Sequence, residues 1–286
     1  MSAPHPATPA ALPTSQPAPT SPATSPAISP PTSRRQPGRG RERPRARAGF
    51  AVVALAALAI AVISVATYGQ ASLRELAADD AGLASAYADE PVLVQGALYV
   101  HITTSAFALV AGVLQLSARL RRRAPRGHRV LGRAYLVAVG VGAVSSLVIL
   151  PANSAGLTGV FGFGTLAVLW AGSGARALVA IRRGDVAGHE AWMLRTYALT
   201  FAAVTLRTWT GVLLAVLAPG SGPDADADAL FAQAYAPVPF LAWLPNLVVA
   251  EWLIRRRGLP AYRLTSVPAP AQGRAVTAPA LTAPGP

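Results

Sequence analysis

Cysteine and lysine are absent from this 286-residue chain, and charged residues make up only 13% of it. Without cysteine the chain cannot form disulfides, thiolate metal sites or iron–sulfur clusters, and it has no cysteine nucleophile. Its 52% of hydrophobic residues and its mean hydropathy of +0.41 are too high for a soluble protein of this length. The scarcity of charge therefore indicates an integral membrane protein.

Six apolar segments are long enough to cross a bilayer as helices. They are Gly49–Tyr68, Val92–Ser117, Val130–Leu150, Leu157–Ile181, Gly188–Val216 and Phe231–Ile254. The sequence thus predicts an all-α fold, a polytopic membrane bundle of six transmembrane helices within residues 49–257. The flanking stretches 1–48 and 258–286 are rich in proline and alanine and have little to bury, so we expect them to be disordered.

Arginine runs occupy every second connection between these segments. The amino-terminal tail, the turns at Arg121 and Arg182 and the run from Arg255 are basic, whereas the loops Glu75–Glu90 and Asp224–Asp228 and the turn at Asn153 are not. Basic connections face the cytoplasm, so both termini are predicted to be cytoplasmic. The net charge of +13 lies in these runs beside apolar spans, which favours anionic lipid headgroups as partners and not nucleic acid.

The use of arginine without lysine, together with abundant alanine, proline and glycine, suggests a GC-rich bacterial genome. The expected location is therefore the inner (plasma) membrane of a bacterial cell, which the chain would cross several times.

The fifth segment carries ionisable residues inside an apolar stretch. His189 and Arg207 lie eighteen positions apart, hence on one azimuth of a continuous helix. Thr196 and Thr200 fall within about 20° of the same line. Such a polar stripe must face protein or water, because lipid cannot satisfy it.

His101 in the second segment and Arg207 in the fifth are expected at similar depths from the outer surface. Ser105 follows on the same helix face as His101, in a strip of small and polar residues suited to close helix contact. We therefore expect a polar cavity lined by His101, Ser105, Thr200 and Arg207, which would suit a quinone carbonyl, an anion or a small polar solute. In the alternative, Arg207 bonds to backbone carbonyls or hydroxyl groups and only fixes helix packing.

The third and fifth segments begin alike, which indicates a duplicated helical hairpin formed by segments 2–3 and 4–5. Gly-His stands just before the third segment, at His128, and at the start of the fifth, at His189. In both places an Arg-x-Tyr triplet follows. The repeat would place the two histidines at equal depth near the cytoplasmic side. They are candidate haem or metal ligands, or else helix-start residues with a structural role.

Charged residues near the cytoplasmic ends of the segments are candidates for ion pairs. Glu251 in the sixth segment could pair with Arg195 or with Arg176, both of which lie close enough to the inner surface to extend their side chains toward it. The sequence assigns no catalytic residue.

A set of motifs resembles a known family. His101 is followed by Gly-His-Arg-x-x-Gly-Arg-x-Tyr at 127–135, by His-x-x-Trp-Met-x-Arg-x-Tyr-x-x-Thr at 189–200, and by Arg207. This set is similar to the domain-of-unknown-function family 2306 of bacterial membrane proteins, a resemblance that covers about residues 90–215 and implies no established activity. The paired-hairpin plan also resembles, in architecture alone, the cytochrome b561 superfamily, in which histidines on helices two to five hold haem.

Three classes of function follow from these observations. The first is a redox component linked to haem b or quinone, with His128 and His189 as axial ligands. Against it, Gly162 occupies the position in the fourth segment that corresponds to His101, so an outer haem would lack its second ligand. The second is a small-solute transporter or channel-like protein that uses the His101–Arg207 cavity. The third is an accessory or sensory membrane protein without turnover; the sequence does not decide among them, nor does it fix the oligomeric state.

Overall fold

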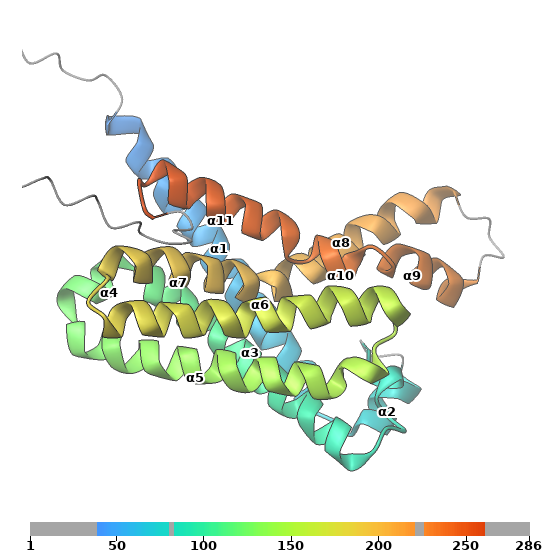
Figure 1. Ribbon diagram of the computed structural model, residues 1–286. Helices are drawn as coiled ribbons and strands as arrows, with labels where there is room; N and C mark the ends of the chain where they lie inside the picture. Colours follow the sequence, from blue (N-terminus) through green and yellow to red (C-terminus); the bar gives the residue numbers. More distant parts are fainter. Residues whose placement is uncertain (1–38, 80–82, 221–225, 261–286) are drawn as a thin grey trace, which may run out of the picture. The chain divides into compact units, whose positions relative to one another are not determined.

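The computed structural model describes residues 39–79, 83–220 and 226–260, with backbone alone up to residue 46. The chain divides into two units, Met1–Arg43 and Pro44–Pro286, and the second holds the helical bundle drawn in Figure 1. Every regular element in the described ranges is helical, so the all-α prediction is confirmed. Residues 1–38 and 261–286, most of the two predicted tails, lie outside the described residues.

Six helical spans in the described residues are long and apolar enough to cross a membrane, as predicted. The first four lie in α1 (Arg39–Gly69), α3 (Val92–Leu116), α5 (Pro125–Ile149) and α6 (Gly156–Arg182). The fifth comprises α7 (Val186–Thr200) and α8 (Ala202–Leu217), and the sixth comprises α10 (Val238–Leu241) and α11 (Leu244–Arg256). The protein is therefore a multi-pass membrane protein that lies in a lipid bilayer.

The bundle is built from two helical hairpins that pack side by side. One pairs α3 with α5 through the short helix α4 (Ala118–Arg123), and the other pairs α6 with α7. The helix α5 also packs on α6, and α11 lies along α7 (Figure 1). Small residues permit the close approach: a Cβ on Gly112 would lie 2.4 Å from the Tyr197 ring, and one on Gly142 would lie 3.0 Å from Trp170.

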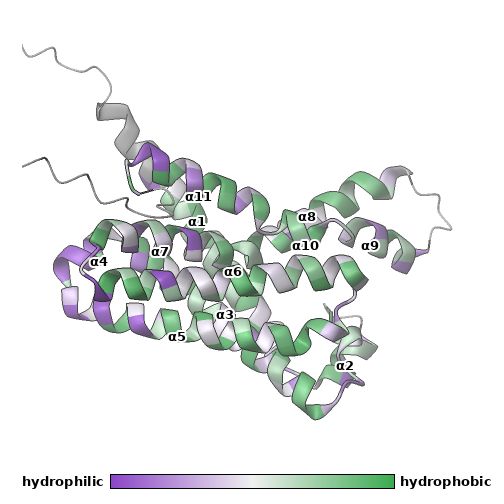
Figure 2. Cartoon of the chain, in the orientation of Figure 1, coloured by the Kyte–Doolittle hydropathy of each residue, from purple (hydrophilic) through white to green (hydrophobic). Residues whose placement is uncertain are grey.

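The distribution of hydropathy agrees with a membrane-spanning bundle. Figure 2 shows hydrophilic residues gathered around α4 and at the adjoining ends of α5 to α7, whereas the middle of the bundle is hydrophobic. The arginine run that ends α11 lies at the same end, since Arg257 forms an ion pair with Glu190 near the start of α7, at 3.2 Å. The arginine-rich connections of the described bundle thus share one end.

The first span, Arg47–Gly69, agrees with the predicted Gly49–Tyr68 within two residues. Its helix, α1, extends further toward the amino terminus, to Arg39. The sixth span begins at Val238, later than the predicted Phe231, because the preceding residues form the separate helix α9 (Ala227–Tyr235). Pro237 lies between α9 and the span, and Pro239 is the second residue of α10.

The loop Glu75–Glu90 is more ordered than its polar composition suggested. It contains α2 (Leu73–Ala78), which begins with a capping box between Ser72 and Glu75, and the turn η1 (Ala84–Ala86). The pKa of the Glu75 carboxyl is held below its usual range by the hydrogen bonds from Ser72. Leu73 and Leu76 are buried in one cluster with residues from the start of α3 and the end of α5, so this segment covers that end of the bundle.

The fifth span is not the continuous helix that the sequence predicted, because it breaks at Phe201. The amide of Asn246, on α11, donates to the Ala198 carbonyl at 3.2 Å and to Thr205 Oγ1 at 2.9 Å. Thr205 Oγ1 in turn donates to the Ala242 carbonyl. A side chain that takes up a helix carbonyl interrupts the helical ladder. The azimuth calculated for a straight helix therefore does not hold across Phe201.

Candidate functional site

A cavity of about 230 Å³ lies between the helices, lined by residues from α1, α3, α5, α6, α7, α8 and α9. Most of its wall is apolar, contributed by residues such as Ile102, Ile149, Phe163 and Leu206. The polar groups are few, and they are His101, Ser105, Ser146, Asn153, Ser154, Trp170, Arg207 and the tyrosines 68, 87 and 235. The combination of an apolar wall with a few polar groups is typical of sites for small molecules.

His101 enters the cavity from α3 with a fixed ring orientation. Its Nδ1 lies 2.9 Å from the carbonyl oxygen of Gly142 on α5. A carbonyl only accepts, so Nδ1 carries the hydrogen and donates it. Among the residues that the structure describes, Nε2 has no hydrogen-bond partner. This nitrogen is available to a molecule in the cavity.

Arg207 lines the same cavity from α8. Its guanidinium donates to the Ala203 carbonyl at 2.9 Å and to Ser64 Oγ, on α1, at 2.8 Å. No carboxylate pairs with it among the described residues. A guanidinium has five N–H donors, so further donors remain for a molecule in the cavity. An uncompensated charge inside a membrane span is expensive and usually functional.

Three tyrosines, which the sequence reasoning did not single out, also line the cavity. Tyr68 lies in the last turn of α1, and its hydroxyl accepts a hydrogen bond from the Leu83 amide at 3.1 Å. Tyr87 follows η1, where burial, with Tyr68 and Glu90 nearby, raises the pKa of its phenol to about 12. Tyr235 ends α9. The capping box Ser72–Glu75 marks the start of α2 in the sequence, but it does not indicate that Tyr87 reaches the cavity.

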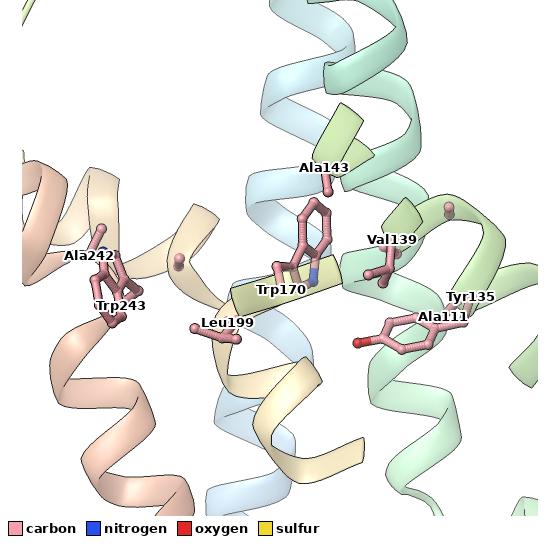
Figure 3. Packing of buried hydrophobic residues seen from close by; sticks show 11 residues of the cluster. Ala111, Tyr135, Val139, Ala143, Trp170, Leu199, Ala242 and Trp243 are labelled. Carbon is pink, nitrogen blue, oxygen red and sulfur yellow. The ribbon is translucent and has the colours of Figure 1, made fainter. Parts of the chain in front are cut away.

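Ser105 and Thr200 differ in their placement. Ser105 lines the cavity, and its buried Oγ has no hydrogen-bond partner in the described part of the chain. Thr200 is not among the lining residues: its hydroxyl donates to the Thr196 carbonyl and accepts from Trp170 Nε1 at 2.9 Å. The Tyr135 hydroxyl, 2.9 Å away, supplies the second donor. The hydroxyl of Thr200 thus has all its hydrogen bonds within the protein. Its partner Trp170 lines the cavity and lies beside Val139 in Figure 3.

The two histidines at the arginine-rich end are close enough to interact electrostatically. His189 Nδ1 donates to the Ala177 carbonyl on α6 at 2.9 Å. His128 Nδ1 is buried without a hydrogen-bond partner in the described residues, and the His128 carbonyl accepts from Gln115 Nε2. No cluster of three or more His, Cys, Asp or Glu within the described ranges could hold a metal ion.

The ion pair at this end joins Arg195 to Glu251. Arg195 Nε lies 2.5 Å from Glu251 Oε1, and Nη2 lies 3.0 Å from Oε2, which makes the contact bidentate. Arg176 instead places its guanidinium 4.9 Å from the centre of the Trp192 ring, and the Arg195 guanidinium is 4.5 Å from the same ring. This cluster is separate from the cavity and ties α7 to α6 and α11.

Comparison with known proteins identifies a family and no activity. The model of the family described as "Predicted membrane protein (DUF2306)" matches residues 98–254. The match takes in most of α3, all of α4 to α10 and most of α11, and hence His101, Arg207 and the Arg195–Glu251 pair. No curated protein and no solved structure matches the chain.

Proposed function

The chain belongs to the DUF2306 family of predicted membrane proteins, and from the His101–Arg207 cavity we propose that it binds the ring of a membrane quinone and acts as a quinone-linked redox component. A quinone ring is flat and apolar on its faces and carries oxygen atoms at opposite edges. The cavity offers an apolar wall to the faces and polar groups to the edges.

The uncompensated charge of Arg207 is the observation that carries this proposal. A guanidinium that faces an apolar cavity without a carboxylate is stabilised by any ligand that brings an electron-rich oxygen to it. The size is suitable, because a dry cavity of roughly 150 Å³ holds benzene, and 230 Å³ leaves room for ring substituents. Trp170 and Phe163 add aromatic surface to the wall.

The test is binding of a short-chain quinone to the purified protein in lipid nanodiscs, measured by calorimetry and by the rise in melting temperature. A ligand at 100 times its dissociation constant stabilises a protein by about 2.7 kcal/mol. We expect Arg207→Gln to weaken binding about 10- to 100-fold, since hydrogen bonds to charged groups contribute about 1.5–3 kcal/mol. Arg207→Lys, which keeps the charge, should lower the quinone affinity less than Arg207→Gln does.

The matched control is Arg176→Gln, which removes an arginine of the neighbouring helix α6 that lies over Trp192 and does not line the cavity. Its quinone affinity should equal that of the wild type. Equal affinities of the Arg207→Gln and Arg176→Gln variants, or no saturable binding by the wild type, would refute the proposal.

A redox role also requires an electron partner, and His128 and His189 are the residues that would hold a haem. Their chemistry suits axial ligation: the Nδ1–H of His189 is fixed by a carbonyl, as in many ligating histidines, and His128 Nδ1 is unpartnered. A bound haem would supply one-electron transfer. A Soret band in the purified wild type that disappears in both the His128→Ala and the His189→Ala variant would support this part of the proposal. If the wild type expressed with haem precursor shows no Soret band, the haem part of the proposal is refuted.

The helix breaks favour a second candidate, a small-solute transporter. Ala202 and Ala203, at the start of α8, line the cavity, and discontinuous helices often border transport sites. Uptake of small radiolabelled anions into proteoliposomes tests it. Uptake that requires Arg207 and is not competed by quinone would favour transport over quinone binding.

A further inference from the structure

His101 on α3 and Arg207 on α8, which both line the cavity, have opposite hydrogen-bonding character. In the neutral His101 ring, the hydrogen on Nδ1 is used by the Gly142 carbonyl at 2.9 Å. The free Nε2 then has only a lone pair and can only accept. The remaining N–H groups of Arg207 can only donate. Of these two groups, His101 therefore presents an acceptor to the cavity and Arg207 presents donors.

From this polarity, and resting on the proposed quinone function, we propose that the site selects the reduced, hydroquinone form of its ligand and that His101 is the specificity-determining residue. A hydroquinone hydroxyl donates to His101 Nε2, and the oxygen of the opposite hydroxyl accepts from Arg207. The lone pair of Nε2 and the donors of Arg207 are then both satisfied.

The oxidised form cannot satisfy both groups. A quinone has only carbonyl oxygens, which pair well with Arg207 but bring a lone pair against the lone pair of Nε2. A buried polar group that is left unsatisfied costs enough to lower affinity by roughly tenfold or more. Ser105 does not satisfy the lone pair of Nε2. Its Oγ is buried and makes no hydrogen bond, to Nε2 or to any other group, in the described part of the chain. The Gly142 carbonyl keeps the ring from turning over, since Nδ1 would lose its acceptor.

The experiment compares a short-chain hydroquinone, kept reduced by dithionite under argon, with the matching quinone, on the wild-type chain in nanodiscs. Calorimetry gives each affinity. His101→Asn keeps a donor near the position of Nδ1 and removes Nε2. It should leave quinone affinity unchanged and lower hydroquinone affinity about tenfold, to the level of the quinone. His101→Gln places an amide near the position of Nε2 and should raise the affinity for the quinone relative to the hydroquinone.

An independent measurement does not depend on a folded variant. The ¹⁵N shifts of histidine-labelled wild type should show an unprotonated Nε2 and a protonated Nδ1 for the His101 ring in the ligand-free protein. A protonated Nε2, equal affinities for the two redox forms, or a preference that survives His101→Asn would each overturn the inference and leave quinone binding intact. Failure of the wild type to bind either form would instead refute the proposed function itself.

Discussion

Removal of the Glu251 carboxylate should destabilise the bundle strongly, because the buried Arg195 guanidinium then loses its bidentate counter-charge. The Arg195 side chain is only 2% exposed and that of Glu251 is 22% exposed, and the two share a bidentate contact. Breaking a buried ion pair from one side costs about 3–5 kcal/mol. The Trp192 face 4.5 Å from the guanidinium remains and offsets part of that cost. We therefore expect Glu251→Ala to cost about 3 kcal/mol, the lower end of the range.

The assay is thermal unfolding in nanodiscs, followed by circular dichroism. A loss of 3 kcal/mol corresponds to a fall in melting temperature of about 6–12 °C for a domain of this size. The matched control is Glu190→Ala, which removes a carboxylate from the Arg257 pair, where both side chains are more than 40% exposed. Exposed pairs contribute about 0–1 kcal/mol, so this control should shift the melting temperature by only a few degrees.

The double variant Arg195→Leu/Glu251→Leu separates the two contributions. If the cost of Glu251→Ala comes from the buried guanidinium that has lost its carboxylate, removing both charges should recover most of the lost stability, because apolar replacement of a buried pair is often neutral or better. The reasoning fails if Glu251→Ala is no worse than Glu190→Ala, or if the double variant melts no higher than Glu251→Ala.

Three further predictions concern topology, packing and pH. A reporter that is active only outside the cytoplasm should work when fused after Glu90 and not after Arg183; the reverse would place both termini outside. Gly162→Ala should destabilise the bundle by about 1–3 kcal/mol, because the added Cβ would lie 2.5 Å from Pro239 Cβ. The control Gly172→Ala, where an added Cβ meets nothing within 4 Å, should not destabilise it. Equal melting temperatures of the two variants would contradict this prediction. The pKa of Tyr87 is raised to about 12, so the folded state holds the phenol proton where the unfolded state loses it. Stability is therefore complete below about pH 10 and declines between about pH 10 and 12, and Tyr87→Phe should remove that part of the decline.

The apolar spans were readable from the sequence because the bilayer fixes both their length and their hydropathy. The structure confirms six of them, and ten of the twelve boundaries lie within four residues of those predicted. The break at Phe201 was not readable, because no proline or glycine marks it. Its cause is Asn246, which lies 48 positions from Ala198 and interrupts the ladder through a tertiary hydrogen bond. Long-range polar contacts of this kind leave no periodic signal in the sequence.

The candidate site was readable in part for the same reason. Depth below the membrane surface can be counted along a helix, and His101 and Arg207 were paired by that count; both line the cavity. Azimuth cannot be counted across a break, and Thr200 lies in the buried network of Tyr135 and Trp170 instead. The tyrosines of the cavity come from segments outside the predicted spans or from span ends, where hydropathy is not informative.

The two arginines of the fifth span show how the same residue type serves two purposes. Arg195 is buried, receives a bidentate carboxylate from Glu251 and stacks on Trp192, so the fold itself supplies everything that its charge requires. Arg207 bonds only to the Ala203 carbonyl and the Ser64 hydroxyl among the described residues, and it faces a cavity. A structural arginine in a membrane needs its partner within the chain, since lipid provides none. Because the bundle neutralises Arg195 and leaves Arg207 uncompensated, the missing partner of Arg207 is best sought in a ligand.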